Sequence, residues 1–148
     1  MFNRDIKQHE IEEMLGMLKE TLKETVFFPL LGRAEIFQVQ GKRGKDVFDI
    51  RIYRGSINAR KYNLGALISF RKIPLLELHI NPGNKHTNPD GTIIKGSHWH
   101  VLSESNGREI AYPAEEINSE LFIENTVMFL NRFHVVKKPD IQYLPDLL

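Results

Sequence analysis

The sequence predicts an α+β fold, with an antiparallel sheet of about five or six strands flanked by an N-terminal and a C-terminal helix. Apolar residues recur at steps of three and four near both ends of the chain, whereas the middle alternates between apolar and polar residues. The chain has 148 residues and no internal repeat. That length is typical of one domain, so residues 1–148 are expected to form a single domain.

Both helices are predicted from their apolar periodicity. The first runs from about Asp5 to Thr25, because one apolar stripe continues through this segment and Pro29 stands just beyond it. The residues of that stripe are Ile11, Met14, Leu15, Leu18 and Leu22. The second helix begins at Asn118 or Ser119, either of which can cap a helix N-terminus, and ends near Phe133.

The strands are predicted from alternation and from turn residues between the runs. Within the second strand, Arg51 and Tyr53 face away from Ile50 and Ile52, so one face of the sheet is expected to meet water. Residues 81–96 are predicted to be a loop, Asn106-Gly107 a hairpin turn, and the tail from Ile141 to Leu148 to pack back on the domain. The predicted strands are Ala34–Gln40, Val47–Arg54, Leu64–Phe70, Ile73–Ile80, Ser97–Glu104 and Arg108–Tyr112.

The composition excludes several classes of protein. Without cysteine the chain has no disulfide, no thiolate metal site and no cysteine nucleophile. No apolar run approaches the roughly 18 residues of a membrane span, and the first ten residues contain no signal-peptide core. We therefore expect a cytoplasmic protein that does not bind membranes.

The charge is unevenly distributed along the chain. Residues 1–74 hold 14 basic against 9 acidic residues, and residues 75–148 hold 6 against 10. Nine basic residues lie between positions 42 and 72, where they either attract phosphate or cover exposed strands and turns. The net charge of +1 is too neutral for a nucleic-acid mimic, and the pI of about 8.0 is below that of a dedicated nucleic-acid binder.

Histidines carry the most specific chemical signal. Four of the six lie within 22 positions: His79, His86, His98 and His100. Period two places His98 and His100 on one face of their strand, and antiparallel pairing would lay His79 beside them. The part of the loop that carries His86, residues 81–91, contains two prolines and two glycines, so it can turn stiffly and fold His86 over the pair.

Imidazole nitrogens are ligands for zinc and related late transition metals. We predict that the four histidines hold a zinc ion, with Asp90 or Glu77 as an alternative fourth ligand. A structural site is favoured because an ion would attach the loop to the sheet, whereas three histidines and a water would form an open, potentially catalytic site. Without metal, His98 and His100 would simply be surface residues that pack against side chains of the adjacent strands. His9 and His134 are expected to be ordinary surface residues.

Other constellations give weaker hypotheses. The chain has no G-x-S-x-G turn and no glycine-rich phosphate loop. The main alternative to a protein with a structural zinc site is a ribonuclease toxin, with His98 or His100 as general base. The residue that would hold a phosphate is Arg51, Arg54, Lys61 or Lys72. A nucleic-acid-binding accessory domain is a further alternative.

Two segments resemble an uncharacterised prophage-borne family of Gram-positive bacteria. They are Leu76–Glu104, which reads INPG…HTNPDG…GSHWHVLSE, and the stretch FDIRIYRGSINARKYN, so the likeness covers roughly residues 35–115. Members of that family share a strand, an N-P-D-G loop and an H-x-H strand. They carry an acidic residue at the place of His79, which implies that histidine and carboxylate are interchangeable ligands there.

Small phage proteins of this style include type II anti-CRISPR proteins, which inhibit the Cas9 effector and of which at least one contains zinc. The resemblance implies a non-enzymatic protein that binds Cas9 and blocks guide loading, target-DNA loading or the step before cleavage. The acidic second half of the chain is expected to meet the basic surface of the effector. Its candidate contact residues are Glu109, Glu115, Glu116, Glu120 and Glu124.

Overall fold

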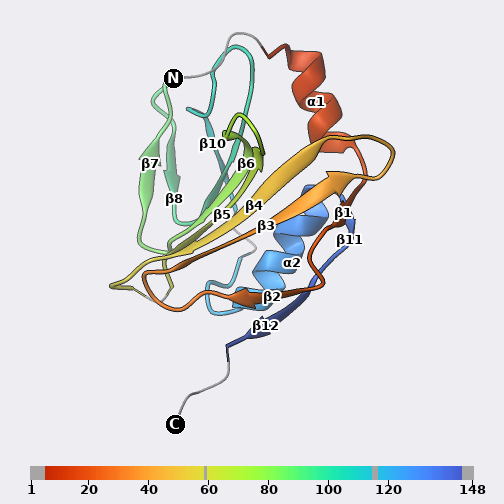
Figure 1. Cartoon of the computed structure of the whole chain (residues 1–148). Helices are drawn as coiled ribbons and strands as arrows, with labels where there is room; N and C mark the ends of the chain where they lie inside the picture. The colour runs from red at the N-terminus through yellow and green to blue at the C-terminus, as the bar shows by residue number, and fades with distance from the viewer. Residues whose placement is uncertain (1–5, 59, 115–116, 145–148) are drawn as a thin grey trace.

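The structure, a computed structural model, describes residues 6–58, 60–114 and 117–144. This part of the chain forms an α+β fold with two helices and a large mixed sheet of eight strands (Figure 1). The helices are α1 (Gln8–Gly16) and α2 (Phe122–Arg132). The strands are β1 (Lys19–Thr21), β2 (Thr25–Phe28), β3 (Ala34–Gly41), β4 (Val47–Arg54), β5 (Tyr62–Ile68), β6 (Ile73–Ile80), β7 (Lys85–Thr87), β8 (Ile93–Lys95), β9 (His98–Val101), β10 (Ala111–Pro113), β11 (Val135–Lys137) and β12 (Asp140–Tyr143).

The large sheet has the strand order β10-β9-β6-β5-β4-β3-β1-β11. Its neighbours are antiparallel except β1 and β11, which run parallel. The predicted α+β class is confirmed, as are six strands in the predicted regions. The sheet is larger than the five or six strands expected because β1 and β11, which alternation did not reveal, extend it beyond β3.

The predicted alternation is confirmed in the central strands. In β5 every second residue from Tyr62 to Ile68 is buried, and in β4 the exposed Arg51 and Tyr53 face away from the buried Ile50 and Ile52. Asp49 is the exception, because it is buried although it lies on the outer face of the sheet. Its carboxylate accepts hydrogen bonds from Ser69, Gln38 and Lys72.

The hydrophobic core lies between the inner face of the sheet and α2, which crosses that face (Figure 1). Trp99 of β9 stacks on Phe129 of α2 with ring centroids 6.1 Å apart, and Phe48 of β4 meets Phe133 edge-on at 5.3 Å. Burying each of these side chains contributes about 2–3 kcal/mol. The contact between Trp99 and Phe129 therefore anchors β9, whose opposite face carries two of the candidate histidines, against the helix.

The N-terminal helix is shorter than predicted. It ends at Gly16, and the chain continues as β1 and β2 in the segment that was expected to be helical through Thr25. The predicted stripe is wrong beyond this point, because Leu18 and Leu22 are exposed whereas Lys19 is buried. Glycine weakens a helix, and the backbone gains strand hydrogen bonds to β3 and β11 instead. The predicted start at Asp5 lies outside the described residues.

Several other boundaries differ from the predictions. Helix α2 begins at Phe122, since Asn118 accepts a hydrogen bond from the Glu120 amide in a turn before the helix. The predicted loop at residues 81–96 contains the β7–β8 hairpin. The return strand β10 begins at Ala111 rather than at residue 108, although the turn at Gly107 is present.

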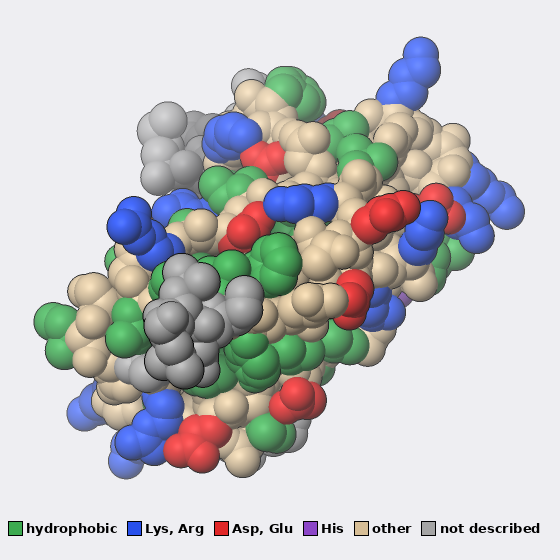
Figure 2. Space-filling view, turned by 60° about the horizontal axis from the view of Figure 1, so that its bottom comes forward, with side chains coloured by type: hydrophobic (Ala, Val, Ile, Leu, Met, Phe, Trp, Pro, Cys, Tyr) green, Lys and Arg blue, Asp and Glu red, His purple; other side chains and the backbone are tan. Residues whose placement is uncertain are grey.

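The C-terminal segment packs back on the fold through β12, which pairs in parallel with β2. Residues 145–148 of the predicted tail lie outside the described residues. The end of the molecule where β2 and β12 lie presents hydrophobic side chains among charged ones (Figure 2). Within the described ranges, neither helix has the length and apolar character needed to cross a membrane.

Lys19 provides a test of the fold, because its buried ammonium joins the ends of both helices. Its Nζ donates hydrogen bonds to the carbonyl oxygens of Leu15, Met17 and Phe133, at 3.2, 2.9 and 2.7 Å. Lys19→Met removes this donor from all three carbonyls, and only that of Leu15 keeps a hydrogen bond, from His134, so we expect the free energy of unfolding to fall by about 3 kcal/mol in urea denaturation. The exposed Lys23→Met is the control and should cost less than about 1 kcal/mol. Equal losses in the two variants would contradict this role.

Candidate metal centre

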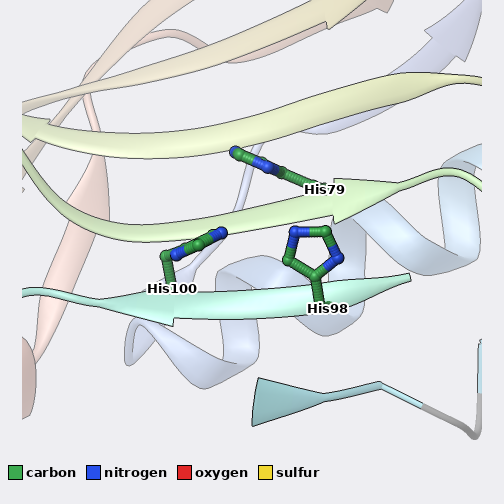
Figure 3. Close-up of side chains that lie close together, drawn as sticks. All are labelled: His79, His98 and His100. Carbon is green, nitrogen blue, oxygen red and sulfur yellow. The ribbon is translucent and has the colours of Figure 1, made fainter. Parts of the chain in front are cut away.

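The pairing of β6 with β9 brings three of the predicted ligands together. His79 lies directly opposite His98, and Glu77 lies opposite His100. Because period two puts all of these side chains on the outer face, the imidazoles of His79, His98 and His100 lie together above the two strands (Figure 3). One ring nitrogen of each lies within 4.8 Å of the others. These three histidines could therefore bind a single metal ion.

The fourth predicted ligand, His86, comes from β7 of the hairpin. Its ring centroid lies 5.4 Å from that of His98 and 5.1 Å from that of His100. The structure thus brings it against the other rings, but the compact set of nitrogens is formed by His79, His98 and His100. The loop therefore brings the His86 ring next to the strand histidines, as predicted, but His86 lies at the edge of the cluster.

Backbone carbonyls orient three of the rings. Nδ1 of His98 lies 3.0 Å from the Gly96 oxygen, and Nδ1 of His100 lies 2.7 Å from the Arg108 oxygen. Nε2 of His86 lies 3.2 Å from the Glu109 oxygen. Since a carbonyl only accepts, each of these nitrogens acts as the donor, which leaves the other nitrogen of each ring as the one that could face a metal. Metal-binding histidines have this arrangement, with the second nitrogen held by an outer partner.

Burial keeps the two central imidazoles neutral. His98 is 1% and His100 is 7% exposed. Burial lowers the pKa of His100 to about 4, helped by repulsion from His79, and burial also lowers the pKa of His98. A neutral imidazole is the form that binds a metal, so both rings are available as ligands at neutral pH.

The alternative carboxylate ligands are engaged elsewhere. Glu77 forms a two-pronged ion pair with Arg108, at 2.6 and 2.5 Å, and its Oε1 lies 3.9 Å from Nε2 of His79. Burial alone would raise the pKa of Glu77, but the contacts with His79 and Arg108 lower it. Asp90 lies at the tip of the hairpin, where it accepts a hydrogen bond from the Thr92 amide. Glu77 therefore borders the cluster as a partner of His79, whereas the Asp90 carboxylate stabilises the turn in which it lies.

The hairpin is held over the outer face by polar contacts. The side chain of Asn88, in the N-P-D-G loop, exchanges two hydrogen bonds with the backbone of Ala111, at 2.8 and 3.0 Å. The Gly96 amide donates to the Asn84 carbonyl, and Gly96 adopts a φ of 80°, which favours glycine. The Asn88 contacts attach the hairpin to β10 and the bond between Gly96 and Asn84 closes its base, so that His86 is brought to the cluster.

The predicted phosphate-holding residues do not gather around the histidines. Arg54 packs its guanidinium over the rings of Phe28 and Phe122, and Lys72 pairs with Asp49. Of the four, Arg51 lines a hollow together with His79. Sequence reasoning missed Arg108, which both orients His100 through its carbonyl and pairs with Glu77. Its position after the Asn106-Gly107 turn was the available signal.

The remaining histidines lie away from the cluster. His9 is exposed on α1, as predicted. His134 is exposed, but it is more constrained than an ordinary surface residue, because its φ is 61° and its Nδ1 donates to the Leu15 carbonyl.

Comparison with known proteins places the chain in a family. A model described as a family of unknown function (DUF6978) matches residues 6–135. The chain belongs to this family. The matched range of the DUF6978 family includes both helices and all four candidate histidines. No curated protein and no solved structure matches the chain.

Metal binding should be coupled to stability. Adding Zn²⁺ to chelator-treated protein at about 100 times its dissociation constant should stabilise the fold by about 2.7 kcal/mol and raise the Tm by roughly 5–10 °C. His98→Ala and His100→Ala should abolish this shift, because each removes one of the three central ligands. His9→Ala is the matched control and should keep it. A shift that persists in both cluster variants would place the ion elsewhere.

Proposed function

We propose that this chain is a zinc-binding protein in which His79, His98 and His100 hold the ion and His86 completes the coordination. The observation that carries the proposal is the convergence of three imidazoles, two of them buried, across one strand pair. A tetrahedral set of four donors is the usual arrangement of a structural zinc site. In a chain without cysteine, imidazoles supply the donors.

The choice of zinc follows from the ligand type. Nitrogen donors suit zinc, copper, nickel and iron, whereas calcium and magnesium require oxygen ligands. Zinc has no redox chemistry and imposes little geometric preference, so it accepts rings presented by two strands and a hairpin. The carboxylate of Glu77 near His79 supports the assignment, because zinc-bound histidines commonly have a carboxylate as outer partner.

The position of His86 supports a structural role for the ion. Its hairpin consists of two three-residue strands, and Ile94 is the buried hydrophobic residue within the predicted loop at 81–96. Apolar burial therefore contributes little to holding this segment. An ion shared by His86 and the strand histidines would attach the hairpin to the sheet, and its binding energy would become folding energy.

The wider role as a Cas9 inhibitor stays a prediction based on resemblance. Of the acidic residues expected to contact the effector, Glu109, Glu120 and Glu124 are exposed. Glu120 lies 3.9 Å from Arg60 in a surface ion pair. Glu115 and Glu116 lie outside the described residues. These three exposed carboxylates are accessible to a basic surface of a partner.

The zinc proposal is tested on the purified full chain. Elemental analysis should find about one zinc per chain, and X-ray absorption at the zinc edge should show four nitrogen neighbours at about 2.0 Å. His86→Ala should keep the metal with one ligand replaced by oxygen, because the three strand histidines remain. His134→Ala is the control and should change neither measurement. Protein that binds no zinc under these conditions would refute the proposal.

The inhibitor hypothesis is tested separately. Binding of the chain to Cas9, with and without guide RNA, should reduce target-DNA binding in a gel-shift assay if the resemblance carries over. A charge-reversed variant, Glu109→Lys together with Glu124→Lys, should bind more weakly because it would meet basic residues of the effector. Undiminished DNA binding at saturating protein would reject the hypothesis without affecting the zinc site.

A further inference from the structure

A hollow of about 330 Å³ opens on the outer face of the sheet next to the histidine cluster. Two rows of side chains cross the sheet there. The first row runs from Arg51 through Gly65 and Glu77 to His100, and the second runs from Tyr53 through Asn63 and His79 to His98. The hollow lies over β4, β5 and β6, and His79 belongs both to its lining and to the histidine cluster. Its volume is that of a small-molecule site.

The floor of the hollow is made by a glycine. Gly65 lies between Arg51 and Glu77 in the first row, and a Cβ built on it would meet only the Leu67 side chain, at 3.6 Å. Its backbone conformation is ordinary for a strand, so backbone strain does not require glycine here. The register of β5 and β6 also shifts between Ala66 and Leu67 at the rim. Glycines and bulges inside strands often mark places where a ligand approaches the backbone.

The polar groups on one wall lack partners within the fold. Among the described residues, the side chains of Arg51 and Asn63 make no hydrogen bond or ion pair. The guanidinium of Arg51 lies over the ring of Tyr53, 6.0 Å from its centroid. On the opposite wall, Glu77 is neutralised by Arg108. Since Glu77 and Arg108 cancel, the hollow carries the net positive charge of Arg51.

We infer that this hollow binds a small molecule through an oxyanion, either a carboxylate or a phosphate. The guanidinium of Arg51 matches the two oxygens of such a group, and the Asn63 amide lies two positions along the neighbouring strand to donate a further hydrogen bond. Gly65 admits the ligand close to the sheet. The bound molecule would extend toward His79 and the Glu77–Arg108 pair.

This site does not depend on the zinc proposal. Its polar wall comes from β4 and β5, whereas the metal ligands come from β6, β7 and β9. His79 is the residue that the two sites share. The anion site can therefore be measured in metal-free and in zinc-loaded protein, and each proposal can fail by itself.

The probes are acetate and methyl phosphate, followed by NMR of the ¹⁵N-labelled full chain. Saturable shifts of the Arg51, Asn63 and Gly65 amides are expected, with a dissociation constant of about a millimolar for so small a ligand. Saturation by one probe rather than the other identifies the oxyanion as carboxylate or phosphate, and either supports the site. Zinc content is determined on the same samples, so a loss of metal is recognised independently.

Two variants and a control decide the assignment. Arg51→Gln should weaken probe binding about tenfold, because it removes the charged, two-pronged contact. Gly65→Leu should abolish binding by filling the hollow, with circular dichroism confirming that the sheet is intact. Arg33→Gln, an exposed arginine just before β3, should leave binding unchanged. Absence of saturable shifts with both probes, or equal weakening by Arg33→Gln and Arg51→Gln, would overturn the inference.

Discussion

The register between β6 and β9 is the constraint on which the candidate site depends. A strand presents alternate residues to each face, so the pairing of His79 with His98 also places Glu77 beside His100 and turns Leu78 and Trp99 inward. A slip by one residue would send the imidazoles into the core and the apolar side chains into water. The hydrophobic core thus selects the same register that assembles the histidines.

That register is held from the inner face. Trp99 stacks on Phe129 of α2, and β9 is a short strand whose further pairing, with β10, lasts only three residues. The helix therefore stabilises the position of the two β9 histidines, although it contributes no ligand itself. On the outer face, backbone carbonyls hold one nitrogen of His98 and of His100. The rings are consequently oriented before any ion arrives, which lowers the entropy lost on metal binding.

The outer face combines two chemical environments. Around His98 and His100 it is buried and nitrogen-rich, whereas over Gly65 it is open and carries the charge of Arg51. Glu77 connects the two, because its carboxylate binds Arg108 and also lies near His79. The same carboxylate thus lies beside a candidate metal ligand on one side and forms a neutralised wall of the hollow on the other. A ligand in the hollow and an ion at the histidines would therefore both lie close to the ion pair of Glu77 and Arg108.

Much of this protein was determined by local sequence pattern. Alternation located β4, a run of β-forming residues located β6, and the H-x-H spacing put His98 and His100 on one face, because a strand has a period of two wherever it lies. Other features depended on contacts between distant segments. Helix α1 stops at Gly16 because β3 and β11 offer the next residues strand partners, and His86 reaches the cluster because Asn88 binds Ala111. Arg108 joined the site through a carboxylate 31 residues away. Periodicity reports only which face a residue occupies, whereas the partner across that face is decided when the chain folds.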